Sequence, residues 1–422
     1  MTQDTRTQKD AGGSDKFLTK PILIIFLTVV VDLIGFGIVI PVLPYYVDSE
    51  LFNGTPFDYG MIVASYSIMQ FFFAPIFGAV SDRYGRRLIL FVSLLGTAVG
   101  FVTVGLATTL WMVYAGRILD GITGGNISTA QAYIADVTSR ENRARGMGLI
   151  GAAFGIGFVL GPALGGILST FGPHVPFLFA AGMALVNALA VYFFLPESLD
   201  LAKARSQPRE LNRFAVIFQS LKDVSFRGIT IIYFLITVGF TVMTTAFVLY
   251  TEERFGYDAH ANGWLFLFIG ALAVGLQGGV FARLSKQFGE PNLTIAGTVL
   301  LTLSLFAVPF VGPASGGLAA LLIGITFFSI GNSIASPALT SLASKNAPEH
   351  EQGKALGIMQ SGASLARAIA PVAAGFLLNN AVGEVDDLTI ERTFWTASAI
   401  MLVAFFTAIY YLVRRADDVL AS

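Results

Sequence analysis

Long apolar runs, separated by short polar turns, follow one another along almost the whole chain. A helix needs about 20 residues to cross the hydrocarbon core of a bilayer, and most of these runs reach that length. The pattern predicts an all-α integral membrane protein with twelve transmembrane helices in two pseudo-symmetric six-helix bundles. The expected spans are 21–45, 59–80, 88–107, 109–133, 146–169, 176–195, 228–250, 262–282, 292–311, 316–338, 353–378 and 393–413.

Lysine and arginine fall in alternate turns, which predicts the orientation of the spans. Because basic residues in short loops stay on the cytoplasmic side, both termini are expected to face the cytoplasm, in a multi-pass protein of the cytoplasmic (inner) membrane. Turns on the opposite side are acidic, and their basic residues are Arg254 and Arg392. The positively charged turns contain Arg83, Arg86 and Arg87; Arg140, Arg143 and Arg145; Arg283 and Lys286; and Lys345 and Lys354.

The spans divide six and six around one long polar stretch, 196–227. We expect a cytoplasmic tail at 1–20, an N-terminal bundle at 21–195, this stretch as a cytoplasmic linker, a C-terminal bundle at 228–413 and a cytoplasmic tail at 414–422.

The two halves also resemble each other in sequence. When 139–168 is aligned with 348–377 at a fixed offset, Pro162 matches Pro371 and Gly166 matches Gly375. An even number of spans separates the copies, so they share one orientation. Parallel repeats with a substrate site between them at mid-membrane are one plan of membrane transporters.

Composition supports a membrane protein and excludes several kinds of site. The chain is 55% hydrophobic and 13% charged, whereas soluble domains are about 25% charged. Its net charge of −1 offers no basic surface for nucleic acid, and without cysteine it has no disulfide, thiolate metal site or cysteine nucleophile. The three histidines, His174, His260 and His350, fall in predicted loops. We expect no metal, no cofactor, no catalytic residue and no enzyme activity.

Three ionisable residues inside predicted spans are candidates for proton coupling. Asp32 lies roughly halfway along the first span, where a charge costs about 2.5–3.5 kcal/mol. Arg117 and Asp120, three residues apart in the fourth span, are neighbours on one helix face. Because a buried arginine stays charged and needs partners, we expect all three to form one buried cluster in which Asp32 or Asp120 gains and loses a proton. A permanent structural ion pair is the alternative.

The turn between the second and third spans, 78–87, combines glycines with charges. Glycine permits a tight turn, and Asp82 can pair with a cation or with the positive end of a nearby helix. Contacts that form and break in this way can close one face of a protein. We expect a cytoplasmic gate; topology anchoring by the arginines is the alternative. The gate residues are Gly78, Asp82, Arg83, Gly85, Arg86 and Arg87.

The fifth span carries a stripe of glycines interrupted by a proline. Each glycine inside a helix costs about 1 kcal/mol relative to alanine, but in lipid small residues let backbones approach closely. We expect this face to pack against the other half and seal the external side; ordinary tight packing is the alternative. Its residues are Gly151, Gly155, Gly161, Pro162, Gly165 and Gly166.

Several polar side chains inside the spans are candidates for a central substrate cavity, although hydrogen bonds between helices would explain each of them. They are Gln70, Asn126, Gln277, Asn332, Gln360 and Arg367. Candidates for an apolar wall are Phe71, Phe72, Phe73, Phe327 and Phe328.

In these motifs the chain resembles the major facilitator superfamily, in particular its twelve-span drug/proton antiporters and their tetracycline-efflux branch. The resemblance covers essentially the whole chain. It implies the major facilitator fold and export of small molecules in exchange for protons, by alternating access between two rocking halves. The matching motifs are 78–87 (the cytoplasmic gate), 117–125 (the fourth-span motif, whose arginine is implicated in proton coupling), 151–166 (the antiporter motif), 32–44, 132–136 and 195–198.

The chain departs from the tetracycline pumps in its second half. The resemblance implies titratable residues in spans eight and nine, but 262–282 and 292–311 contain no Asp, Glu or His, and Gln277 is the one clear polar candidate. Polar partners for a metal–tetracycline chelate are therefore missing. We expect a monomeric, proton-coupled exporter of amphipathic small molecules. A proton symporter that imports a sugar or organic acid is the alternative, and a non-transporting receptor or an intramembrane enzyme is a remote one.

Overall fold

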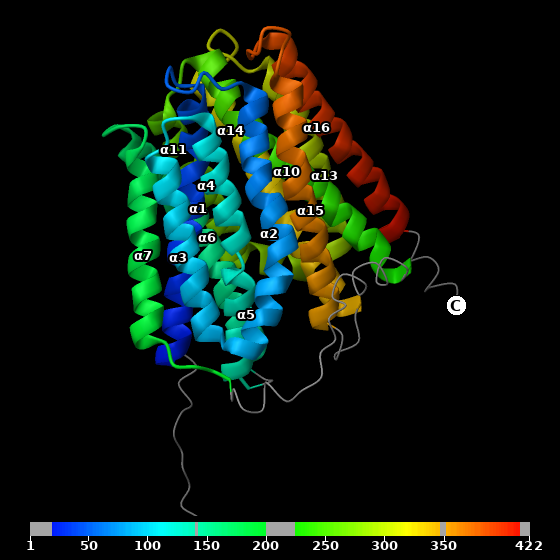
Figure 1. Cartoon of the computed structure of the whole chain (residues 1–422). Helices are drawn as coiled ribbons and strands as arrows, with labels where there is room; N and C mark the ends of the chain where they lie inside the picture. The colour runs from blue at the N-terminus through cyan, green and yellow to red at the C-terminus, as the bar shows by residue number, and fades with distance from the viewer. Residues whose placement is uncertain (1–18, 140–141, 200–223, 347–351, 414–422) are drawn as a thin grey trace, which may run out of the picture.

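The computed structural model describes residues 19–139, 142–199, 224–346 and 352–413, which form a helical bundle (Figure 1). The N-terminal half contains α1 (Lys20–Asp48), α2 (Pro56–Tyr84), α3 (Arg86–Gly105), α4 (Leu110–Thr123), α5 (Asn126–Val137), α6 (Arg143–Ser169) and α7 (Val175–Phe194). The C-terminal half contains α10 (Val224–Phe255), α11 (Ala259–Gly275), the π-helix η1 (Leu276–Val280), α12 (Phe281–Phe288), α13 (Glu290–Ala307), the 3-10 helix η2 (Val308–Phe310), α14 (Gly317–Asn346), α15 (Gln352–Leu378), α16 (Asp387–Ala408) and the π-helix η3 (Ile409–Val413).

Local sequence signals set several helix ends. Thr55 and Asp58 form a capping box at the start of α2, followed directly by Pro56, and Asp386 caps α16 in the same way. Gly85 separates α2 from α3 with a φ of 104°, a left-handed conformation that glycine adopts without strain. The predicted tight turn between the second and third spans is therefore a single residue long.

Eleven helices in the described part of the chain are long and apolar enough to cross a membrane. The predicted fourth span, 109–133, is wrong as one continuous helix, because Gly124 and Gly125 divide it into α4 and α5. At the usual rise of about 1.5 Å per residue, the two pieces together are long enough for a twelfth crossing. The predicted span 262–282 extends from Ala259 to Phe288 through η1. His260 consequently lies in the first turn of α11 and not in a loop.

Each half repeats the same packing of helices, which confirms the predicted pseudo-symmetry. In the N-terminal half α1 packs on α6, and α3 packs on α4 and α7. In the C-terminal half α10 packs on α15, and α13 packs on α14 and α16. Between the halves the main contacts are α2 with α15 and α6 with α11, which are equivalent pairs under this symmetry.

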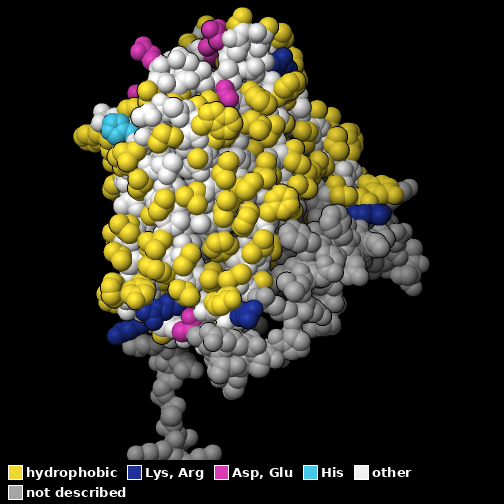
Figure 2. Space-filling view, in the orientation of Figure 1, with side chains coloured by type: hydrophobic (Ala, Val, Ile, Leu, Met, Phe, Trp, Pro, Cys, Tyr) yellow, Lys and Arg dark blue, Asp and Glu magenta, His cyan; other side chains and the backbone are white. Residues whose placement is uncertain are grey.

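An apolar belt surrounds the bundle, and charges gather at its two ends (Figure 2). We call the end that carries Arg83, Arg87, Arg145 and Lys345 the basic end, and the end that carries Glu252, Glu253, Asp258 and Glu384 the acidic end. The first helix begins and the last one ends toward the basic end (Figure 1). Arg254 and Arg392 lie at the acidic end in local contacts, Arg254 with Asp387 at 2.8 Å and Arg392 with the carbonyl oxygen of Asn379 at 2.6 Å.

Some predictions fall outside the described residues. These are both terminal tails apart from their innermost residues, most of the linker, Arg140, His350, and the side chains of Arg143 and Lys354. The proposed domain boundaries stay predictions.

Candidate functional site

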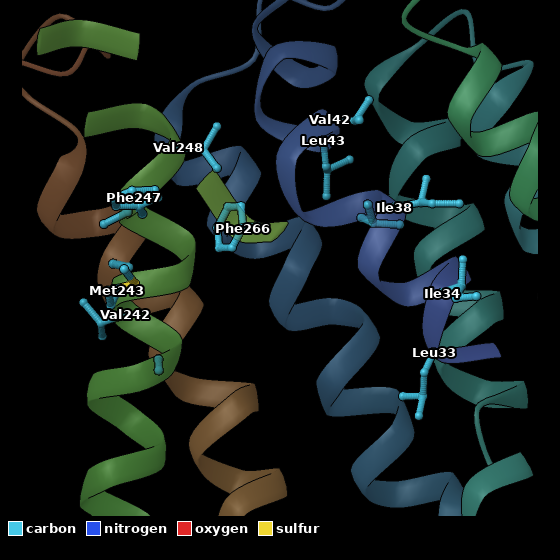
Figure 3. Close-up of a cluster of buried hydrophobic side chains, with 14 of the residues drawn as sticks. Leu33, Ile34, Ile38, Val42, Leu43, Val242, Met243, Phe247, Val248 and Phe266 are labelled. Atoms are coloured by element: carbon cyan, nitrogen blue, oxygen red, sulfur yellow. The ribbon is translucent and has the colours of Figure 1, made fainter. Parts of the chain in front are cut away.

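A cavity of about 670 Å³ lies between the two halves. One wall comes from α1, α2 and α6, and the other from α10, α11, α14 and α15. Apolar side chains close it on the side of the acidic end. Leu43 of α1, Met243 of α10 and Phe266 of α11 all line it, and Figure 3 shows them in the surrounding apolar cluster.

Two matching crossings of the halves seal the acidic end. Gly166 of α6 meets Gly263 of α11, where a Cβ on either residue would approach a backbone oxygen of the other helix to 2.8 Å. Gly375 of α15 meets Gly60 of α2, and a Cβ on Gly375 would come 2.7 Å from the oxygen of Pro56. Glycine is needed at these points because the backbones leave no room for a side chain.

The halves separate toward the basic end. Along α6, Gly166 touches the backbone of α11, a Cβ on Gly155 would meet only Val274 at 3.4 Å, and Gly151 has nothing within 4 Å. The cavity therefore opens toward the basic end.

The glycine stripe of α6 has two faces, so the expectation that it packs as a whole on the other half is wrong. Gly161 and Gly165 meet the α1 backbone within their own half, at Gly37 and Ile38. Gly155 and Gly166 face α11, and the oxygen of Pro162 faces Gly263. The spacing explains the division: at about 100° per residue, Gly161 and Gly165, four residues apart, share one side of the helix, and Gly155 and Gly166, eleven residues apart, share another.

Five of the six predicted polar residues line the cavity: Gln70, Gln277, Asn332, Gln360 and Arg367. Asn126 does not; its side chain is buried, with an exposed fraction of 5%. Of the predicted phenylalanines, Phe328 alone lines this cavity. Phe72 and Phe327 are about half exposed on the outside of the bundle, at 50% and 48%.

Five aromatic rings form an arch along the cavity wall, from one half to the other. They follow one another as Tyr66, Phe36, Phe158, Phe240 and Phe328, and the centroids of successive rings lie 5.9, 6.1, 6.4 and 6.0 Å apart. All five line the cavity. Ring contacts at these separations stabilise one another and offer flat apolar surface to a ligand.

Asp32 lines the cavity from α1, and its partner is Asn126. The Nδ2 of Asn126 donates a hydrogen bond to Oδ1 of Asp32, and its Oδ1 accepts one from the backbone N–H of Ile127 at 2.8 Å. Asn126 is the first residue of α5, directly after the break at Gly124 and Gly125. The break between α4 and α5 therefore directs the side-chain amide of Asn126 toward Asp32 of α1.

Arg117 and Asp120 form a separate, buried pair beside it. Nη1 of Arg117 lies 2.6 Å from Oδ2 of Asp120, and the guanidinium stands 4.3 Å from the centre of the Tyr66 ring. Among the described residues Asp32 makes no ion pair with Arg117, so the expected three-member cluster consists of two adjoining pairs. Tyr66 joins this region to the arch, and its hydroxyl accepts a hydrogen bond from Gln70 at 2.9 Å.

At the basic end, Arg86 and not Asp82 is the centre of the predicted gate. Arg86 is buried and contacts Asp82 and Ser81 at 2.6 Å and Asp136 at 3.1 Å. The carboxylate of Glu197 accepts the backbone N–H of Arg86 at 2.9 Å. All these partners belong to the N-terminal half.

The other gate residues have smaller roles in this arrangement. Arg83 stacks on its neighbour Tyr84, Arg87 contacts the Tyr192 ring and its carbonyl oxygen, and the oxygen of Gly78 accepts from Ser81 at 2.7 Å. No group of three or more histidine, cysteine, aspartate or glutamate residues in the described part of the chain could hold a metal ion.

The family model of the Major Facilitator Superfamily matches residues 25–371 and 280–421. The chain belongs to this superfamily. As a major facilitator protein it is a multi-pass membrane transporter and not an enzyme.

The relatives of this facilitator include tetracycline resistance proteins. It is 36% identical to the tetracycline resistance protein, class C, of Escherichia coli over 358 residues, which are 83% of this chain and 88% of that protein. It is 31% identical to the class H protein of Pasteurella multocida over 404 residues, 94% of this chain and 98% of that one. The crystal structure of the human organic anion transporter MFSD10 (TETRAN) superposes with a TM-score of 0.68 and 25% identity, covering 92% of this chain and 99% of that one.

The gate motif and two of the motifs that resemble the tetracycline-efflux pattern, 132–136 and 195–198, meet in one place in this facilitator. Asp136 of 132–136 accepts hydrogen bonds from Arg86 of the gate motif at 3.1 Å and from Ser198 of 195–198 at 3.0 Å. The hydroxyl of Tyr133 also donates to the oxygen of Pro196 at 2.9 Å. Although the three motifs are far apart in sequence, they form one hydrogen-bonded network at the basic end.

Sequence reasoning missed several residues of the facilitator's cavity. Tyr66, Phe36, Phe158, Phe240 and Tyr233 line it without having been singled out. Aromatic residues occur throughout the spans, so nothing in their spacing marks those that face inward. The pair of glycines at 124 and 125 was a readable signal for the helix break that positions Asn126.

Proposed function

We propose that this facilitator exports amphipathic small molecules from the cell in exchange for protons, by alternating access. The observation that carries the proposal is the carboxyl group of Asp32, which lines the central cavity at mid-membrane and is bound by Asn126 at the break of the fourth crossing. Intramembrane acids are rare, and they mark proton pathways in transporters. The relatives named as tetracycline resistance proteins support export.

The open side of the cavity fits this proposal. By the distribution of lysine and arginine, the basic end faces the cytoplasm, with both termini on that side of the cell membrane. The described state is then open inward, ready to take substrate from the cytoplasm. We propose a monomer as the working unit.

In the proposed cycle, Asp32 binds a proton when the cavity is open to the outside and releases it when the cavity opens to the cytoplasm. The crossings at Gly166 and Gly375 would separate in the outward-open state, and the basic ends of the halves would meet. Arg117, held by Asp120 and the Tyr66 ring, keeps a fixed positive charge near this acid. That charge is already paired with the Asp120 carboxylate, so the group that stabilises the Asp32 carboxylate directly is the amide of Asn126.

The test uses everted membrane vesicles with an acidic lumen and three tracers: tetracycline, the cation ethidium and the anion 2-naphthoate. An antiporter accumulates at least one of them as protons leave the lumen. Asp32→Asn should abolish this accumulation but keep substrate exchange in the absence of a gradient. Glu253→Gln, an equivalent change at an exposed carboxylate of the acidic end, should leave both intact.

Full proton-driven accumulation by Asp32→Asn would refute the assignment. Proton-driven movement in the opposite direction would identify a symporter.

A further inference from the structure

Arg367 of α15 lines the cavity with a charge that no ion pair holds in the described structure. A guanidinium is permanently protonated and has five N–H donors. In the described structure Arg367 makes one side-chain hydrogen bond, from Nη2 to the hydroxyl of Ser364 at 3.2 Å, and no ion pair. None of its nitrogen atoms is both buried and unbonded. The remaining donors are therefore open to the cavity.

The ionisable groups that interact with Arg367 are the hydroxyls of Tyr66 and Tyr233, which also line the cavity. Both are neutral at physiological pH. The acids nearby are already engaged, since Asp120 pairs with Arg117 and Asp32 accepts from Asn126. The N-terminal side thus carries one net negative charge while Asp32 is ionised and none once Asp32 holds a proton, whereas the C-terminal wall presents one positive charge that no ion pair holds in the described structure.

A cation removed from bulk water without a partner is unfavourable, and a bound carboxylate or sulfonate would supply two oxygens for its forked donors. The aromatic arch lies next to this group, because its first ring, Tyr66, is also a neighbour of Arg367. The cavity volume of about 670 Å³ is within the range of small-molecule sites, about 300–1,000 Å³.

We propose that Arg367 is the anion-binding residue of the cavity, and that the substrates of this facilitator are amphipathic organic anions whose aromatic body lies along the arch. Transport of these anions rests on the proposed function, whereas their binding to Arg367 does not depend on it. Asp32 and Arg367 lie on opposite halves, and no hydrogen bond or ion pair joins them in the described structure. The proton and the anion therefore occupy separate sites.

The experiment compares two probes of equal shape, 2-naphthoate and 2-naphthamide. Their equilibrium binding to the purified full-length protein is measured by titration calorimetry in nanodiscs of phosphatidylcholine. We expect naphthoate to bind at least about tenfold more tightly. Arg367→Gln should remove this preference, and Arg367→Lys should retain part of it, because lysine keeps the charge without the fork. Arg283→Gln, at an exposed position of α12, is the matched control and should change nothing.

Naphthoate binding no tighter than that of naphthamide, including binding of neither, would overturn the proposal. So would a preference that survives in a folded Arg367→Gln protein. The wild-type comparison stands even if a variant does not fold. An anion preference without proton-driven flux would refute the exporter alone, and export of tracers by a protein without anion preference would refute the anion site alone.

Discussion

Asn126 donates a hydrogen bond to the carboxylate of Asp32 across 94 residues of sequence, and so ties the break of the fourth crossing to the acid of the first. A proton that binds Asp32 changes the group this amide contacts. Because Asn126 begins α5, such a change is transmitted directly to a helix end and from there toward the basic end.

Replacement of Asn126 by alanine should uncouple proton binding from transport. A hydrogen bond to a charged group contributes about 1.5–3 kcal/mol, so proton-driven accumulation in everted vesicles should fall about tenfold or more. Asn187→Ala is a close control, because Asn187 is also buried and also donates to α1, at the carbonyl oxygen of Thr28, 3.0 Å away. The control should lower thermal stability without changing the ratio of protons to substrate. Equal losses of coupling in both variants would mean that Asn126 is structural.

The network around Arg86 should stabilise the N-terminal half more than its neighbouring arginines do. Arg86→Gln leaves Asp82 and Asp136 without their common partner, and because both carboxylates are partly exposed the expected loss is about 1.5–3 kcal/mol, the range for hydrogen bonds to charged groups. Arg83→Gln, at an exposed position, should cost less than about 0.5 kcal/mol. Thermal unfolding followed by the fluorescence of the three tryptophans measures both. Similar unfolding temperatures for the two variants would reduce the motif to a topology anchor.

The sequence identified which residues make up the charged site better than it identified which of them contact one another. Asp32, Arg117 and Asp120 stand out because charges are rare inside apolar runs, and the pairing of Arg117 with Asp120 follows from their spacing on one helix. The pairing of Asp32 with Asn126 depends on how α1 and α5 are rotated and on the break between α4 and α5. The hydropathy pattern contains neither the rotation of these helices nor the geometry of the break.

The fold was readable for a similar reason. Span length, charge in alternate turns and the repeated Pro-x-x-x-Gly of 162–166 and 371–375 specify two parallel six-helix units. The division of the α6 glycines between α1 and α11 needed the three-dimensional packing, because a stripe of small residues does not identify its partner. The aromatic arch could not be predicted either, because nothing in the sequence shows which of the 37 phenylalanines face the cavity.

The crossing at Gly166 should control which end of the cavity is open. A valine there has no space, since a Cβ already lies 2.8 Å from the oxygen of Ala259, so Gly166→Val should force the halves apart at the acidic end. Gly182→Val adds the same side chain where nothing lies within 4 Å and serves as control. Because the chain has no cysteine, Ser336→Cys in the cavity wall is a single reporter site. Its labelling from the basic side by an impermeant maleimide should slow several-fold in Gly166→Val only, and an unchanged rate would contradict a gating role for this crossing.

Tyr45 should hold the acidic end closed by hydrogen bonds between the halves. Its hydroxyl donates to the oxygen of Tyr257 at 2.7 Å and accepts from Nδ2 of Asn262 at 2.8 Å, and Asn262 is fully buried. Tyr45→Phe removes both bonds, a loss of about 1–3 kcal/mol at about 1 kcal/mol per bond, which shifts a two-state equilibrium about 5- to 150-fold toward the outward-open state.

The matched control is Tyr59→Phe, a buried tyrosine whose hydroxyl has no hydrogen-bond partner in the described part of the chain. Spin labels at Ser139→Cys and Lys286→Cys, both exposed on the two halves at the basic end, report the opening as a distance distribution. In Tyr45→Phe the population with the shorter distance should grow, because the basic ends approach as the acidic end opens, and in Tyr59→Phe the distribution should match that of the parent. A parent-like distribution in Tyr45→Phe would show that the glycine crossings alone keep this end shut.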